Sequence, residues 1–200
     1  MANETVFKRY EHNPIVTAAN VPRANSIHNR AIVRFNGAYA GVFRVDEIDL
    51  CYRLHVGSSD DGIRWDIDPD PITMTSDDPD ITVSDHSYDP RLQEIDEGWL
   101  LIYHGVWRSC NGFLYYAGGA LLDLQKPWKV LHRTRDYLLA PTTSYERVGD
   151  VPNVVFPSAA VTFPETGMLR LYYGCADTCV SIAEARIGDI IEFVKTRALH

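Results

Sequence analysis

Two β-rich runs joined by a turn that ends in glycine occur three times in this chain. The copies span residues 26–44, 87–105 and 157–174. Their turn glycines, Gly37, Gly98 and Gly167, are 61 and 69 residues apart. A hairpin repeated at a long period is typical of radially repeated folds, above all the β-propeller. The repeat therefore predicts an all-β chain whose equivalent strands point their ends at one central cavity.

Short segments rich in apolar, β-branched or aromatic residues predict the individual strands. They are Ala31–Phe35, Ala38–Arg44, Arg53–Ser58, Leu100–Tyr103, Phe113–Leu122, Trp128–His132, Leu169–Tyr173 and Ser181–Ala185. Turn-forming residues such as Asn36-Gly37 separate these segments. Ile187 to Thr196 fits either a last strand or a short helix, and we favour the strand.

Each unit continues after its hairpin with a third strand and then an acidic or Pro-containing turn that leads to an aromatic segment. These fourth segments are Asp60–Trp65, Pro127–Val130 and Asp189–Phe193. Four strands per unit is the content of a propeller blade, but a closed ring needs roughly 4–8 blades. The sequence therefore predicts a single domain, residues 1–200, with about three blades' worth of a propeller.

Composition and charge exclude several classes of protein. A chain of 200 residues with 46% hydrophobic residues suits one globular domain. The net charge of −8 argues against a nucleic-acid-binding surface. Met1–Val16 lacks the apolar stretch of a secretory signal, and no apolar run approaches the ~18 residues of a membrane span. We expect a cytoplasmic protein without a membrane partner.

The four cysteines do not follow the spacing of a zinc site. Cys51, Cys110, Cys175 and Cys179 contain no Cys-x-x-Cys pair, and no histidine pair lies nearby at ligand spacing. Half a metal site at Cys175 and Cys179 is the weaker interpretation. Reduced, partly buried thiols are expected instead, with no metal.

Polar side chains cluster at the strand ends that would face the axis of a propeller. They are Asn25, Ser26, Arg44, Asp89, Arg91, His104 and Asp177. A carboxylate, arginines and an imidazole around a cavity suit a polar, anionic or sugar ligand. Aromatic residues that could stack on sugar rings lie close in sequence, namely Tyr88, Tyr103, Trp107 and Tyr115.

Each of these residues also has a purely structural interpretation. Asp89 precedes Pro90 and suits a turn, and Asp177 suits a turn cap. Arg44 lies near Asp46 and could form a surface ion pair of little energetic weight. His104 could be a hydrogen-bonded histidine at a strand end. Their matching positions in the repeats favour the functional interpretation over these separate roles.

Longer motifs carry a family resemblance. They are Asn25-Ser26-Ile27, Phe43-Arg44, Arg53–Gly57, Tyr88–Arg91, Gly98–Val106, Gly149–Val154 and Tyr172–Thr178. Together they resemble glycoside hydrolase family 130, the β-mannoside phosphorylases with some β-mannosidases. The resemblance spans roughly residues 13–196. It implies a five-bladed propeller that cleaves β-mannosidic links with inversion and uses phosphate as the attacking group.

The resemblance also implies roles for individual residues. Asp89 matches the general acid, and one carboxylate suffices because phosphate is already an anionic nucleophile. The positions that match the mannoside-binding residues are Asn25, Ser26, Arg44, Tyr88 and Asp177. His104 and Tyr115 match positions at the phosphate. No cofactor or metal is implied, and inorganic phosphate is the co-substrate.

The chain departs from the family pattern between the motifs Tyr88–Arg91 and Gly98–Val106. Two further blades of the family lie between the Tyr-Asp-Pro-Arg strand and the Gly-Trp-Leu-Leu-Ile-Tyr-His-Gly strand, which adjoin here near Ile95–Gly98. This predicts a hybrid blade with the turn Asp96-Glu97-Gly98. The resemblance assigns the family's main arginine and lysine phosphate ligands to the absent blades.

The expected function is therefore that of an enzyme, a β-1,4-mannoside phosphorylase that releases mannose 1-phosphate. Two alternatives stay open: a sugar-binding remnant without a phosphate site, and a β-mannosidase. Three blades leave two open radial edges, and open edges invite pairing with another chain. A homo-oligomer is therefore expected, with a β-mannoside oligosaccharide and phosphate as the small-molecule partners.

Overall fold

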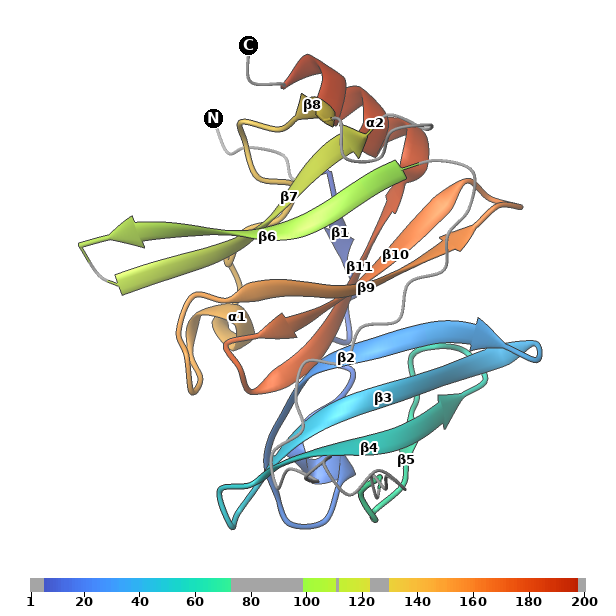
Figure 1. Cartoon of the computed structure of the whole chain (residues 1–200), viewed down its shortest axis with the longest axis vertical. Coiled ribbons are helices and arrows are strands. Elements are labelled where there is room, and N and C mark those ends of the chain that lie inside the picture. Colours follow the sequence, from blue (N-terminus) through green and yellow to red (C-terminus); the bar gives the residue numbers. More distant parts are fainter. Residues whose placement is uncertain (1–5, 73–98, 111, 123–129, 198–200) are drawn as a thin grey trace, which may run out of the picture.

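The computed structural model describes residues 6–72, 99–110, 112–122 and 130–197. Three antiparallel sheets follow one another along the longest axis of the molecule (Figure 1). The first contains β2 (Ala24–Phe35), β3 (Ala38–Glu47), β4 (Tyr52–Ser59) and β5 (Asp66–Ile67). The second contains β6 (Trp99–Ser109), β7 (Gly112–Leu122) and β8 (Val130–Arg133). The third has the order β1-β11-β10-β9.

The third sheet is built from both ends of the described chain. Its strands are β1 (Lys8–Arg9), β9 (Val155–Phe163), β10 (Met168–Cys175) and β11 (Cys179–Arg186). It lies between the other two sheets in space (Figure 1). Its strand β9 contacts β2 on one side and β6 and β7 on the other. We call it the middle sheet, and it positions the strands of the two outer sheets relative to each other.

The expected strands from Ala31–Phe35 to Ser181–Ala185 are confirmed where they fall on described residues, and the hairpin turns explain why. Between β2 and β3, Asn36 and Gly37 have φ values of 50° and 80°. Two successive residues with positive φ form the type I′ turn, whose twist matches the flanking strands. Gly167, between β9 and β10, also has a positive φ of 65°. Local sequence therefore sets these hairpins.

The expectation of a last strand at Ile187–Thr196 was wrong, because this segment is the helix α2 (Ile187–Thr196). Its isoleucine and valine residues are spaced by three and four positions, which places them on one helical face. Ile190 and Val194 on that face are fully buried. The negative charge of Asp189 in the first turn and the positive charge of Lys195 in the last turn also interact favourably with the helix dipole. The β-branched composition misled the strand interpretation.

The assignment of Asp189–Phe193 as a fourth strand was wrong for the same reason. The fourth strand of the middle sheet is instead β1, in which Lys8 pairs with Glu184 and Arg9 with Ala183. In the first sheet the fourth strand β5 begins directly after the expected segment Asp60–Trp65. In the second sheet β8 overlaps the expected strand Trp128–His132, of which residues 128–129 lie outside the described residues.

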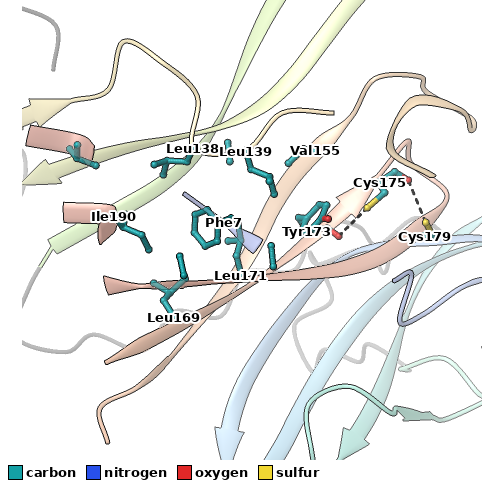
Figure 2. Packing of buried hydrophobic residues seen from close by; sticks show 14 residues of the cluster. Phe7, Leu138, Leu139, Val155, Leu169, Leu171, Tyr173, Cys175, Cys179 and Ile190 are labelled. Atoms are coloured by element: carbon teal, nitrogen blue, oxygen red, sulfur yellow. Dashed lines mark hydrogen bonds between the residues drawn. The ribbon is translucent and has the colours of Figure 1, made fainter. Parts of the chain in front are cut away.

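Two apolar clusters join the three sheets. One lies between the middle sheet, the β6–β8 sheet and α2, and includes Phe7, Leu138, Leu171 and Ile190 (Figure 2). The other lies between the middle sheet and the β2–β5 sheet, and includes Phe43 and other side chains that are at most 8% exposed. The short helices η1 (Ala18–Asn20) and α1 (Ser144–Arg147) lie outside these sheets. Burial of apolar area therefore holds each outer sheet against the middle one.

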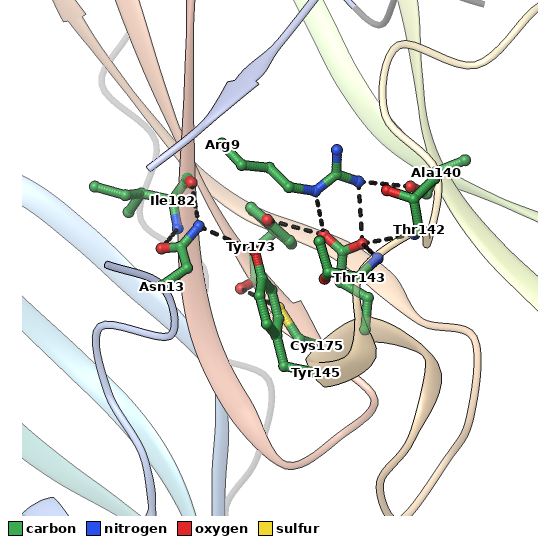
Figure 3. Close-up of polar contacts among 10 residues, drawn as sticks. Arg9, Asn13, Ala140, Thr142, Thr143, Tyr145, Tyr173, Cys175 and Ile182 are labelled. Atoms are coloured by element: carbon green, nitrogen blue, oxygen red, sulfur yellow. Dashed lines mark hydrogen bonds and ion pairs between the residues drawn. The ribbon is translucent and has the colours of Figure 1, made fainter. Parts of the chain in front are cut away.

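A polar network fastens the N-terminal segment to the middle sheet (Figure 3). The Arg9 guanidinium donates through Nε to Glu146 Oε1 at 2.7 Å and through Nη2 to Oε2 at 3.0 Å. The Tyr173 hydroxyl donates to the same carboxylate at 3.0 Å. Asn13 exchanges two hydrogen bonds with the backbone of Ile182 in β11. The first and last parts of the described chain thus form one structural unit.

Among the residues that the structure describes, no helix is long and apolar enough to cross a membrane.

Candidate active site

The turn between β10 and β11 meets the start of β2. Ile27 N–H donates to the carbonyl of Thr178 at 3.4 Å, next to Asp177 in the turn. Ala176 and Asp177 have positive φ values of 48° and 51°. Non-glycine residues adopt positive φ values at an energetic cost, so the surrounding structure must stabilise this backbone conformation. Such strain is common at functional sites. Asp177 thus lies beside the β2 strand that carries Ser26.

A second set of contacts continues from this turn toward β6. Gly174 pairs with Phe156, and a Cβ placed on Gly174 would lie 3.2 Å from Asn29 Oδ1. The His104 ring stacks on Phe156 with the ring centroids 4.4 Å apart. Its centroid lies 6.3 Å from that of Tyr115. Neighbouring side chains therefore connect β2 and β10 with the two predicted phosphate residues.

The loop of residues 149–154 makes a third connection. Val151 N–H donates to the carbonyl of Ala176 at 3.1 Å. Tyr115 N–H donates to the carbonyl of Asn153 at 2.9 Å. This loop thus spans from the Asp177 turn to the strand that carries Tyr115. We call the region from Asp177 through Phe156 to Tyr115 the candidate site.

Arg44 is held by a two-pronged ion pair. Its Nε and Nη2 donate to Asp46 Oδ1 and Oδ2 at 2.9 and 3.2 Å, and its guanidinium lies 4.4 Å from the ring centroid of Tyr52. Residues two apart in a strand share a face, which brings the two side chains together. Both are largely buried, at 14% and 16% exposure. The expected ion pair with Asp46 forms, but it is largely buried and not at the surface as expected. A role of Arg44 in sugar binding stays a prediction.

Asn25 and Ser26 at the start of β2 have different environments. Asn25 is exposed, while Ser26 is fully buried opposite Asp46. Within the described part of the chain, Ser26 Oγ has no hydrogen-bond partner. The register shifts at Asn25, because Ala24 pairs with Glu47 and Ser26 with Asp46, so Asn25 is the extra residue of a bulge. Asn25 is the one of the two that is open to solvent, and both stay predicted sugar ligands.

The remaining predicted site residues fall on residues 73–98. Tyr88, Asp89 and Arg91 lie outside the described residues, as does the expected hybrid turn Asp96-Glu97-Gly98. The structure therefore brings together Asp177, the start of β2, His104 and Tyr115, and it leaves the general acid as a prediction.

Sequence reasoning missed two residues of the candidate site, Asn29 and Phe156. Phe156 supplies the surface on which His104 stacks. Its position at the start of the third repeat, equivalent to the Asn25-Ser26 end of the first, was a usable signal. Asn29 adopts a positive φ of 40°, which nothing in the local sequence indicates.

The described residues contain no group of three or more His, Cys, Asp or Glu side chains that could hold a metal ion. The candidate site includes polar and aromatic groups, which suit recognition of hydroxyl groups and an anion.

Comparison with known proteins assigns the family. The profile of glycoside hydrolase family 130, described as β-1,4-mannooligosaccharide phosphorylase, matches residues 92–196. A β-1,4-mannooligosaccharide phosphorylase of Ruminococcus albus is 30% identical in an alignment that covers 96% of this chain and 92% of that protein. The chain belongs to glycoside hydrolase family 130.

A second relative matches over a shorter stretch, and a solved structure matches over most of the chain. A β-1,2-mannobiose phosphorylase of Thermoanaerobacter sp. is 47% identical over 88 residues, which is 44% of this chain and 28% of that protein. A glycosyl hydrolase structure from Bacteroides ovatus superposes with a TM-score of 0.69 at 14% identity. The superposition covers 92% of this chain and 94% of that one, and it shows the shared fold.

Family 130 proteins of known structure are five-bladed propellers, and this chain is a shortened form of that fold. The alignment with the R. albus relative runs over 308 positions, whereas this chain has 200 residues. More than a hundred alignment positions therefore have no residue here. The fold class expected from the repeat is confirmed, and so is the shortening.

Proposed function

We propose that this chain is an inverting β-mannoside phosphorylase that converts a β-linked mannoside and inorganic phosphate into mannose 1-phosphate. The observation that carries the proposal is the continuous line of contacts from the Asp177 turn to His104 and Tyr115. It links the residues that match the sugar ligands of family 130 with those that match its phosphate ligands. The near full-length relationship to the R. albus phosphorylase supports the same activity.

In the proposed reaction, phosphate attacks the anomeric carbon from the face opposite the leaving group. The bond from that carbon to the glycosidic oxygen breaks, and a bond to a phosphate oxygen forms. Asp89 delivers the proton that the leaving sugar oxygen requires. His104 and Tyr115 donate hydrogen bonds to the phosphate oxygens. Asn25, Ser26, Arg44, Tyr88 and Asp177 hold the mannosyl unit through its hydroxyl groups.

The linkage can be tested directly. The R. albus relative is named for β-1,4-linked substrates, and the Thermoanaerobacter relative for a β-1,2-linked one. We expect phosphorolysis of β-1,4-mannobiose, because the longer alignment is with the former. Purified protein is incubated with each mannobiose, with and without phosphate, and mannose 1-phosphate and free mannose are measured. Release from neither substrate contradicts the activity.

The gap in the alignment favours one second candidate, a sugar-binding remnant that lacks the full phosphate site. Family resemblance assigns the main cationic phosphate ligands to the stretch that is absent here. Titration calorimetry distinguishes the two functions, because the remnant binds mannose but not phosphate. Release of free mannose without phosphate would instead identify a β-mannosidase.

A substitution of His104 tests the phosphate assignment. We expect His104→Ala to raise the KM for phosphate about ten-fold or more, because a hydrogen bond to a charged group is worth about 1.5–3 kcal/mol. The KM for the mannoside should change much less. His12→Ala is the matched control, since His12 is an exposed histidine outside the candidate site. Equal changes in both KM values for His104→Ala would contradict the assignment.

We also propose that the chain self-associates. The β6–β8 sheet turns one face toward the middle sheet, where Leu100 and Ile102 pack. Side chains at the alternating positions face away, and of these Leu101 and Trp107 are 40% and 67% exposed. In a closed propeller the next blade covers such a face. A second copy can cover it here.

Light scattering on a size-exclusion column tests this association. We expect the wild type to elute as a dimer or larger and Trp107→Glu to shift toward the monomer, because a charge is costly in an apolar interface. Val148→Glu is the control, since Val148 is exposed in the loop after α1. A wild-type monomer at all concentrations would contradict the proposal.

A further inference from the structure

Arg30 in β2 is a buried cation without a carboxylate partner among the described residues. The side chain is fully buried, and its Nη2 donates a hydrogen bond to the carbonyl of Ser181 at 3.2 Å. Nε and Nη1 have no hydrogen-bond partner in the described part of the structure. Its guanidinium lies 5.7 Å from the ring centroid of Tyr172. Burial lowers the pKa of Arg30 to about 9. An isolated buried charge is strongly unfavourable, so a nearby negative charge would be stabilised.

Two thiols lie near this cation, on directly paired positions of a hairpin. Cys175 ends β10, Cys179 begins β11, and the two residues are register partners. Both are free thiols with buried side chains (Figure 2). They flank the turn that carries Asp177. Directly opposite Cβ atoms in an antiparallel pair lie about 4.5–5.5 Å apart, close to the about 3.5–4.5 Å of a disulfide.

The surroundings make the two thiols unequal. The Cys179 thiol donates to the Cys175 carbonyl at 4.0 Å, and the Cys175 thiol donates to the Tyr173 carbonyl at 3.8 Å. The contact with Cys175 and the positive charge of Arg30 lower the pKa of the Cys179 thiol, against burial and the charge of Glu146. Burial and the neighbouring Cys179 raise the pKa of the Cys175 thiol. The charged and titratable groups around Cys179 thus come from β2, β10 and α1. Cys179 is the better nucleophile of the pair, and Cys175 is placed to react second.

We propose that Cys175 and Cys179 form a reversible disulfide, with the charge of Arg30 supporting the Cys179 thiolate that reacts first. With hydrogen peroxide as oxidant, the Cys179 sulfur attacks one peroxide oxygen, the O–O bond breaks, and a sulfenic acid and water result. The Cys175 sulfur then displaces the hydroxyl group from that sulfenic acid, which leaves as a second water. Two thiols are oxidised, and one peroxide is reduced to two waters.

The cross-link would join both ends of the turn that holds Asp177 beside β2. It would also remove the thiol whose ionised form the charge of Arg30 favours. A change in mannoside affinity on oxidation therefore rests on the proposed function, whereas the disulfide itself does not. The two can be measured separately, by chemical analysis of the thiols and by calorimetry with mannose.

The test uses the full chain with Cys51→Ser and Cys110→Ser, which leaves only the proposed pair. After treatment of the folded protein with hydrogen peroxide, we expect the number of thiols titrated in denaturant to fall from two to none. The intact mass should decrease by two hydrogen atoms, and dithiothreitol should restore both values. In the matched control, which adds Cys175→Ala, oxidation should stop at sulfenic or sulfinic acid. Persistence of both thiols, or sulfinic acid without a disulfide, would overturn the proposal.

Arg30 is tested in the same background. Arg30→Met removes the charge with similar volume, and we expect the pair to oxidise roughly ten-fold more slowly at neutral pH, because fewer Cys179 thiols ionise. Arg30→Lys keeps the charge and should keep the rate. The pH dependence of wild-type alkylation gives a further reading that needs no substitution of Arg30. An unchanged rate in a folded Arg30→Met protein would remove Arg30 from the mechanism.

Discussion

Replacement of Asp89 by Asn is expected to lower the kcat for phosphorolysis of β-1,4-mannobiose by roughly 10³-fold, because general acid catalysis contributes about 10²–10⁴-fold. Asparagine keeps the size of the side chain but cannot supply a proton to the departing sugar oxygen. The KM values should change little, since phosphate and mannose keep their ligands. Release of mannose 1-phosphate under saturating phosphate is the measurement.

A second substrate separates loss of the acid from loss of the fold. A 4-nitrophenyl β-mannoside has a leaving group that departs without a proton, so Asp89→Asn should retain most of the wild-type rate on it. Asp85→Asn in the same segment is the matched control and should behave as wild type on both substrates. Equal losses on the two substrates would show that Asp89 is not the general acid.

Truncation of Glu146 is expected to cost about 3–5 kcal/mol of stability, the range for breaking a buried ion pair from one side. Glu146 is fully buried and accepts hydrogen bonds from Arg9, Tyr173 and the amides of Thr142 and Thr143. In Glu146→Ala those donors lose their acceptor, and the Arg9 charge loses its counter-ion. Denaturant unfolding monitored by tryptophan fluorescence gives the free energy.

The pair of Arg170 and Glu184 provides the control. Its Nε–Oε1 distance is 2.8 Å, against 2.7 Å for Arg9 and Glu146, but the Glu184 side chain is 41% exposed. Glu184→Ala should therefore cost less than about 1 kcal/mol. Similar losses for the two substitutions would mean that burial of the Glu146 network is not what stabilises the chain.

The same network predicts a pH dependence. Burial opposes ionisation of Glu146, but hydrogen bonds from Arg9 and from the amides of Thr142 and Thr143 outweigh it and lower its pKa from the usual 4.5. A lowered pKa in the folded state means that the stabilisation is complete above pH 4.5 and is lost as the pH falls below that value. Wild type should lose this stability on acidification, and Glu146→Ala should lack this part of the transition.

The strands and hairpins were predictable because their causes are local. Alternating or continuous apolar segments and the Asn36-Gly37 turn contain the information that forms β2 and β3. The three-fold repeat then predicted that these strands form sheets of the kind found in propeller blades. The segment of α2 was expected to be a strand because its isoleucine-rich sequence fits the periodicity of a strand and that of a helix equally loosely. Only the packing of Ile190 and Val194 against the middle sheet decides between the two.

The outer strand of the middle sheet, β1, could not be predicted from its own residues. Two charged residues, Lys8 and Arg9, carry no strand signal, and they pair with β11 because Asn13 and Arg9 find partners far along the chain. The candidate site shows the same division. His104 and Tyr115 were recognisable by family motif, whereas Phe156 contributes through a stacking contact that only the folded chain creates.

The middle sheet has a consequence for synthesis. Of the described strands, its outermost strand β1 is translated first, and the strand that it pairs with, β11, is translated last. The residues of β1 therefore remain unpaired during synthesis, while the β2–β5 sheet already exposes the apolar face that the middle sheet will cover. The middle sheet can therefore be completed only after β11 has been synthesised.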